Sequence, residues 1–147
     1  MSTKKTHLKL RHTIKKKNSR ISNKTNSGIV STFLEILNTV KLYHWHTKSF
    51  PEHKYLDEIY DKLNKTIDRF VEVLLGKDST RIKMVEKRIQ LIDIHTTLKL
   101  KERIFEYRTF LIDMNMYFSP TIDSDLLSIR DDMLADLNQF LYLLTFD

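Results

Sequence analysis

The stretch between Pro51 and Gly76 constrains the fold most, because its apolar residues repeat with the period of a helix. Proline suits the first turn of a helix, and glycine suits the position just past its end. Between them, apolar residues recur at spacings of three and four: Leu56, Ile59, Tyr60, Leu63, Ile67, Phe70, Val71 and Leu74. This pattern forms one wide apolar stripe. The stretch therefore predicts a long amphipathic helix with one face in a core.

Four polar residues of this helix have metal-ligand chemistry and lie beside the stripe: His53, Asp57, Asp68 and Glu72. At 3.6 residues per turn they fall within an arc of about 100°. The first two are one turn apart, as are the last two, so each pair can converge on one ion. The helix rises about 16 Å from Asp57 to Asp68, so the pairs cannot meet in one chain. Two copies packed antiparallel would bring them together, which indicates a metal site shared between subunits. A solvated edge of an ordinary bundle helix is the alternative.

The composition favours long helices around one core. A chain of 147 residues is normally one domain, and only 2 Gly and 2 Pro interrupt it. A second apolar stripe, broken only by His44, predicts a helix that Ser27 or Ser31 would cap: Ile29, Phe33, Leu37, Val40 and His44. On its own, His44 would be interpreted as a core histidine.

The second half of the chain predicts a connector and two further helices. Residues 77–97 show partial alternation without a helical period, so we expect an extended segment that crosses the bundle. Helical spacing returns at residues 98–118, with Leu98, Ile104, Phe105 and Phe110 among the inward positions. Asp123 or Ser124 would cap a last helix that ends near Thr145. Four helices with one long crossover predict an all-α, ferritin-like four-helix bundle over residues 29–147.

Residues 1–28 form a basic segment without an acidic residue. It holds nine positive side chains: Lys4, Lys5, Lys9, Arg11, Lys15, Lys16, Lys17, Arg20 and Lys24. The whole chain carries a formal net charge of +6, so residues 29–147 carry −3. Apolar residues are too sparse in this segment to form a core, which predicts a disordered tail or a marginal helix. Such a tail suits non-specific contact with the phosphates of DNA. A targeting or solubilising role is the alternative.

The residue composition also limits which metals the protein could bind and where in the cell it could be found. The chain has no Cys, so a metal would be held by histidines and carboxylates, which suits iron, manganese or zinc. No apolar run approaches the roughly 20 residues that span a bilayer, and no signal peptide is visible. We expect a soluble protein of the cytoplasm or nucleus, or one packaged inside a virion, and neither membrane association nor secretion.

The region around the long helix resembles the Dps family of ferritin-like mini-ferritins. The family's ferroxidase motif begins with a His-Trp pair, here His44-Trp45. It continues with a His and an Asp four residues later, here His53 and Asp57, and then with an Asp and a Glu at the spacing of Asp68 and Glu72. The loop between the first two histidines is shorter than is usual in the family. The resemblance covers residues 30–76; the end of the chain also resembles Dps-like proteins of large DNA viruses and phages.

The resemblance implies an iron-oxidising protein with sites between subunits. His44, His53 and Asp57 of one subunit would share iron with Asp68 and Glu72 of its partner, and Trp45 would pack near the site. Dps-like proteins oxidise Fe(II) with peroxide or oxygen, often bind DNA through Lys-rich tails, and assemble as dimers and dodecamers. In the family a short helix often lies in the crossover, and residues 77–97 show no equivalent.

Two other function classes also fit the pattern. A helical assembly with a basic tail would condense DNA or line a particle without redox chemistry, and its ligand set would then be a relic or hold a structural Zn(II). An adaptor that uses the fold to bind another protein is the third. His46 points away from His44 and would substitute for it only if the short loop displaced His44. His95 is expected to be an isolated surface or packing histidine.

Overall fold

The computed structural model describes residues 21–146, and this part of the chain is all-helical. It contains four helices and one short 3-10 turn: α2 (Asn23–His46), α3 (Phe50–Asp78), α4 (Thr97–Asp113), η1 (Met114–Met116) and α5 (Ser124–Leu143). No strand occurs within the described range. The expected all-α class is therefore confirmed. The tail positions from Lys4 to Arg20 lie outside the described residues.

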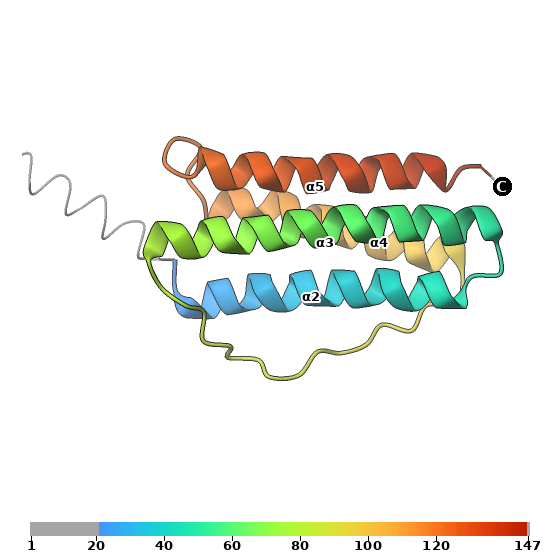
Figure 1. The fold of residues 1–147 in the computed structure, drawn as a ribbon, viewed down its shortest axis with the longest axis horizontal. Helices are drawn as coiled ribbons and strands as arrows, with labels where there is room; N and C mark the ends of the chain where they lie inside the picture. Colours follow the sequence, from blue (N-terminus) through green and yellow to red (C-terminus); the bar gives the residue numbers. More distant parts are fainter. Residues whose placement is uncertain (1–20, 147) are drawn as a thin grey trace, which may run out of the picture.

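The four helices lie side by side along their length (Figure 1). α2 and α3 form an antiparallel pair, and α3 also packs against α5. The segment between α3 and α4 runs the whole length of α2 before α4 begins (Figure 1). As a result α3 and α4 run in the same direction, and α5 returns against α4. The expected order of four helices with one long crossover is confirmed.

One continuous apolar core joins the helices. The stripe expected on α3 is buried at Leu56, Ile59, Leu63, Ile67, Phe70 and Leu74. At its centre Phe33 of α2 makes edge-to-face contacts with Phe70 (5.3 Å between ring centroids) and with Phe110 of α4 (5.8 Å). Two inward positions expected on α4 are wrong, because Leu98 and Phe105 are exposed there. The core face of α4 is built from Ile104 and Leu111, as expected, and from Leu100 and Tyr107, which were not expected there.

The first helix begins earlier than its apolar stripe. The hydroxyl of Ser22, and not that of Ser27 or Ser31, caps α2 by accepting a hydrogen bond from the amide of Thr25 (3.1 Å). The expected boundary between tail and bundle at residue 28 is therefore too late, and Lys24 lies on the first turn of α2. The first turns of α2 show no apolar repeat in the sequence, because their polar side chains Asn23 and Ser27 contact the crossover segment.

The long helix continues past Gly76 to Asp78. Its end comes at Ser79, which adopts a left-handed conformation (φ 51°). The expected stop at Gly76 is thus wrong, and contacts with α5 explain why. The ammonium of Lys77 reaches the carboxylates of Asp125 on α5 (2.9 Å) and of Asp123, the residue just before α5 (3.6 Å), and these contacts stabilise the two further helical residues.

The crossover, residues 80–96, is extended, as expected, and has no helix. Near its start the side chain of Asn23 makes two hydrogen bonds with the backbone of Lys83 (2.7 and 3.0 Å). The hydroxyl of Ser27 accepts another from the amide of Val85 (2.9 Å). Near its end Ile94 is buried in the core. The crossover is thus attached near both ends.

Candidate metal centre

A short turn at residues 47–49 brings the histidines of α2 and α3 to the same end of the fold. The amide of Thr47 donates to the carbonyl of Tyr43 (2.9 Å) and closes the last turn of α2. The hydroxyl of Ser49 accepts from the amide of Glu52 (3.3 Å) and caps α3. Both caps are local, so this turn holds the ends of α2 and α3 in a defined position.

His44 and His53 form a stacked pair across this turn. Their ring centroids are 3.8 Å apart and their planes are inclined by 21°. The Nδ1 atom of His44 lies 2.9 Å from the carbonyl oxygen of His53, and the Nδ1 atom of His53 lies 3.0 Å from the carbonyl oxygen of His44. His44 is buried and His53 is exposed. The structure therefore brings together two of the five expected ligands.

These reciprocal hydrogen bonds define which nitrogen can bind a metal. A carbonyl oxygen only accepts, so each Nδ1 must carry the hydrogen. In the neutral ring the lone pair then lies on Nε2, the atom left for a ligand. Histidines that bind metals typically donate their other N–H to a carbonyl or carboxylate in this way. In both histidines, Nε2 is therefore the atom that can bind a metal.

The three expected carboxylate ligands, Asp57, Asp68 and Glu72, are all exposed on α3. The helix is continuous from Phe50 to Asp78, so Asp57 and Asp68 lie about 16 Å apart along its axis. Within residues 21–146, none of the five expected ligands belongs to a group of three whose donor atoms lie within 4.8 Å of one another. A single chain therefore holds the histidine pair and leaves the carboxylates open at the surface.

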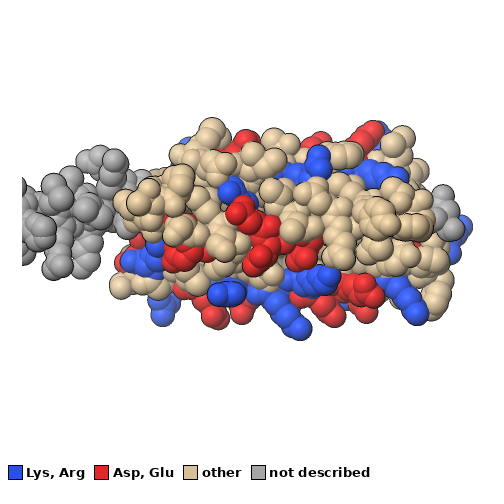
Figure 2. Space-filling view, turned by 90° about the horizontal axis from the view of Figure 1, so that it is seen from above, with Lys and Arg blue, Asp and Glu red and all other residues tan. Residues whose placement is uncertain are grey.

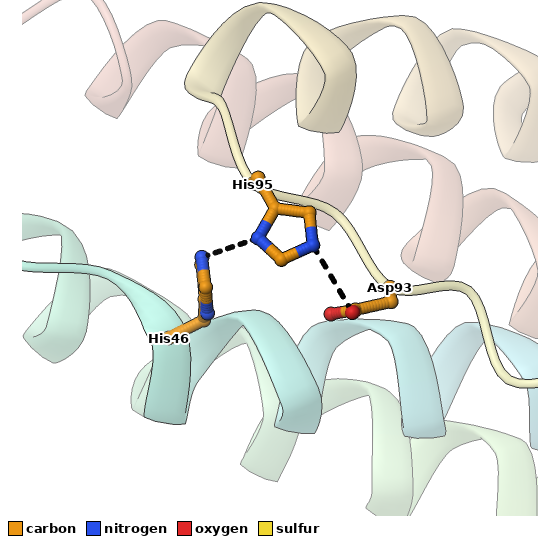
Figure 3. Close-up of side chains that lie close together, drawn as sticks. All are labelled: His46, Asp93 and His95. Carbon is orange, nitrogen blue, oxygen red and sulfur yellow. Dashed lines mark hydrogen bonds and ion pairs between the residues drawn. The ribbon is translucent and has the colours of Figure 1, made fainter.

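One cluster that does meet this criterion was missed from the sequence: His46, Asp93 and His95 (Figure 3). The Nδ1 atom of His95 lies 2.9 Å from Nε2 of His46, and its Nε2 atom lies 3.0 Å from a carboxylate oxygen of Asp93. The rings of the two histidines meet edge to face, with centroids 4.4 Å apart. The expectation that His95 is isolated is wrong.

Local geometry explains this cluster. Side chains two residues apart in an extended segment point to the same side. Ile94 is buried, so Asp93 and His95 both face outward beside the end of α2. The alternation of buried and exposed positions around Ile94 was visible in the sequence. The neighbouring position of His46 was not, since it depends on the path of the crossover along α2.

A buried polar cluster supports the same end of the fold. The carboxylate of Glu52 accepts hydrogen bonds from the hydroxyls of Tyr43 and Thr97 (each 3.2 Å) and so joins α2, α3 and α4. Burial and the negative charge of Glu52 raise the pKa of Tyr43, although the hydrogen bond with Thr97 opposes them. Both α2 and α4 are thus held by one carboxylate on the first turn of α3.

Trp45, which was expected to pack near the site, lies at the histidine end but on the surface. Its side chain is 68% exposed. The ammonium of Lys41 lies 5.6 Å from its ring centroid and 4.5 Å from that of Tyr60. The indole therefore forms part of the outer surface at the histidine end.

Over its described residues the protein is all-helical, with four histidines gathered at one end and a long crossover. The chain belongs to the family of unknown function DUF5856, whose model matches residues 44–144. This match begins at His44 and covers α3, the crossover, α4 and α5. No curated protein and no solved structure matches the chain. None of the helices within the described residues is long and apolar enough to cross a membrane.

Proposed function

We propose that this protein is a Dps-like, ferritin-like four-helix bundle that binds Fe(II) and oxidises it at a site shared between two subunits. The observation that carries the proposal is the stacked pair of His44 and His53, whose Nδ1 hydrogens are held by carbonyl oxygens. Two imidazole Nε2 atoms at one end of α3, with exposed carboxylates along the same helix, are a donor set that suits iron.

The site needs a second copy of the chain to be complete. His53 and Asp57 lie near the start of α3, whereas Asp68 and Glu72 lie beyond its middle. An antiparallel, two-fold arrangement of two α3 helices would place the first pair of one subunit opposite the second pair of the other. It would create two equivalent sites, each with His44, His53 and Asp57 from one subunit. We expect at least a dimer, and a dodecamer if the resemblance extends to assembly.

The chemistry follows from the two ligand types. Carboxylates bind Fe(II) and bind the harder Fe(III) more strongly, which favours loss of an electron. The imidazoles favour transition metals over Mg(II) and Ca(II). Hydrogen peroxide would accept one electron from each of two Fe(II) ions and, with two protons, form two water molecules. Zinc or manganese would occupy the same donors without this turnover.

Iron oxidation by paired variants tests the proposal. Anaerobic protein is mixed with Fe(II) and then with peroxide or oxygen, and absorbance of Fe(III) is followed by stopped flow. The Asp68→Ala/Glu72→Ala variant should lose most of the rate. The matched control is Glu102→Ala/Glu106→Ala, which removes two exposed carboxylates at the same spacing from α4. The control should oxidise iron as fast as the parent. If Asp68→Ala/Glu72→Ala does so too, the assignment is wrong.

Light scattering tests the shared site independently. The protein should be at least dimeric at micromolar concentration and physiological salt, with or without Fe(II). A strictly monomeric protein would exclude a site built from two copies. In that case the function would be the non-enzymatic alternative, a structural or DNA-condensing protein.

A role in DNA binding is the second part of the proposal, and the basic residues of the N-terminal segment support it. On the face shown in Figure 2, Lys and Arg side chains are interspersed with Asp and Glu and do not form one positive patch. The charge of the sequence leads to the same conclusion, since residues 29–147 carry a net −3. DNA would therefore be bound by the basic residues from Lys4 to Lys24. The protein would act inside a cell or a virion.

A further inference from the structure

A second cluster of ligands lies on a different side of α2 from the stacked pair. His44 and His46 are two residues apart on a helix, so their side chains point in directions about 200° apart. His46 instead meets the crossover, where its ring contacts that of His95 (Figure 3). This cluster is independent of the proposed iron site, because it uses none of its five ligands.

We propose that His46 and His95 form a transition-metal site that attaches the end of the crossover to α2, with Zn(II) as the typical occupant. The ligand atoms are Nε2 of His46 and Nδ1 of His95, which already lie 2.9 Å apart. Asp93 orients His95 from the far side of the ring. Water molecules complete the coordination, because all three side chains are exposed.

The hydrogen bond to Asp93 prepares His95 for this role. The ionised carboxylate only accepts, so Nε2 of His95 carries the hydrogen that points to Asp93 (3.0 Å). In the neutral ring the lone pair is then on Nδ1, the atom that faces His46. A carboxylate, a histidine and a metal in this order are a recurring arrangement in zinc proteins. Asp93 is therefore a positioning residue and not a ligand.

Only a small movement separates this geometry from a bound metal. With bonds of about 2.1 Å to each nitrogen, a separation of 2.9 Å corresponds to an angle of about 90° at the metal. A tetrahedral angle requires about 3.4 Å, so the two rings would move apart by about 0.5 Å. The hydrogen now shared between the two nitrogens would move to Nδ1 of His46 when both rings are neutral. Both side chains are at the surface, so neither change disturbs the core.

The crossover path supports a mechanical role for this site. Asn23 and Ser27 of α2 bind the beginning of the crossover through hydrogen bonds to Lys83 and Val85. At the other end, the described polar contact with α2 is the one between His95 and His46. A metal there would replace one exposed hydrogen bond with two coordinate bonds. It would stabilise the folded chain, because the unfolded chain does not hold the two histidines together.

Zinc titration of the full chain tests the site. Isothermal titration with ZnCl2 gives the number of bound ions, and thermal unfolding with and without ZnCl2 gives the stabilisation. His46→Ala and His95→Ala should each remove one binding event per chain and the zinc-dependent rise in Tm that accompanies it. Asp93→Asn should weaken that event about 10-fold or more, because it removes the group that orients the ligand. The matched control, Asp113→Asn, changes an exposed aspartate at the far end of α4 and should bind zinc as the parent does.

The outcomes separate this site from the proposed iron site. Asp68→Ala/Glu72→Ala should retain the event that His95→Ala removes, whatever its effect on iron oxidation. Circular dichroism checks that each variant is folded, and His95→Gln serves if the alanine variant is not. The inference is overturned if His46→Ala and His95→Gln bind as many zinc ions, with the same rise in Tm, as the parent.

Discussion

Replacement of Tyr43 by phenylalanine tests how the histidine end is held together. The variant keeps the buried ring and removes only the hydroxyl that donates to Glu52 (3.2 Å) and lies 3.2 Å from the hydroxyl of Thr97. A hydrogen bond to a charged group contributes about 1.5–3 kcal/mol. This one is longer than the usual 2.7–2.8 Å, and Glu52 keeps its contact with Thr97, so the lower end applies. We expect the free energy of unfolding to fall by about 1.5 kcal/mol.

Urea unfolding followed by far-UV circular dichroism at one fixed protein concentration measures this change. A domain of this size should lose about 5 °C in Tm for such a decrease. Tyr142→Phe is the matched control, since that tyrosine is 61% exposed and its change should stay within about 0.5 kcal/mol. A cycle with Glu52→Gln isolates the pair, and the two substitutions should couple by about 1 kcal/mol. Equal stability of Tyr43→Phe and the parent would refute the view that this carboxylate joins the helices.

Three further predictions address the tail, the end of α3 and the contact between α3 and α5. Deletion of residues 1–20, which stops before α2, should abolish non-specific DNA binding in gel retardation, and binding by the parent should weaken with salt at a log–log slope of about −0.9 per phosphate contact; equal retardation would exclude the tail. Ser79→Gly should raise the free energy of unfolding by about 0.5–1 kcal/mol, because glycine adopts a φ of 51° without a Cβ penalty; a decrease would contradict this. Burial of Asp125 opposes its ionisation, but hydrogen bonds from Lys77 and the backbone outweigh it and lower its pKa. The ionised Asp125 therefore stabilises the fold above its ordinary pKa, and this stabilisation is lost as the pH falls through the lowered pKa. Asp125→Asn should lower the free energy of unfolding by up to about 1 kcal/mol near pH 7 and leave it unchanged in strong acid. Urea unfolding at both pH values measures this difference.

The long helices were predictable because their apolar residues repeat over many turns. The stripe from Leu56 to Leu74 is buried where the period placed it, except that Tyr60 and Val71 at its edges are partly buried. On α4 the period was weaker, and Leu98 and Phe105 are apolar residues that the fold leaves exposed. A period identifies a helix more reliably than it identifies which of several apolar residues face the core.

The helix ends were less predictable because tertiary contacts decide them. Nothing local to Gly76 shows that Lys77 will contact two carboxylates, one on α5 and one just before it, and so extend α3. The start of α2 depends on Ser22, a cap that lies several residues before the apolar stripe begins at Ile29. Local signals compete at such ends with contacts that exist only in the folded chain.

The candidate ligands divide in the same way. His44 and His53 come together across a short local turn, so their proximity follows from the chain itself. The contact between His46 and His95 spans a long crossover, and no spacing in the sequence indicates it. Whether Asp68 and Glu72 meet the histidines of another subunit depends on surfaces between copies, which a periodic pattern within one chain cannot specify.

The crossover also divides the described residues into two helical hairpins, α2 with α3 before it and α4 with α5 after it. Its middle positions, from Glu86 to Leu91, are mostly exposed and include Lys87 and Arg88, a site that trypsin recognises. Cleavage there would leave α2 and α3 on one fragment and α4 and α5 on the other, still joined through a common core. The protein should therefore survive as a nicked, non-covalent pair, and its halves made separately should reassemble. Such a chain lends itself to split reporters, with the new ends placed in the crossover.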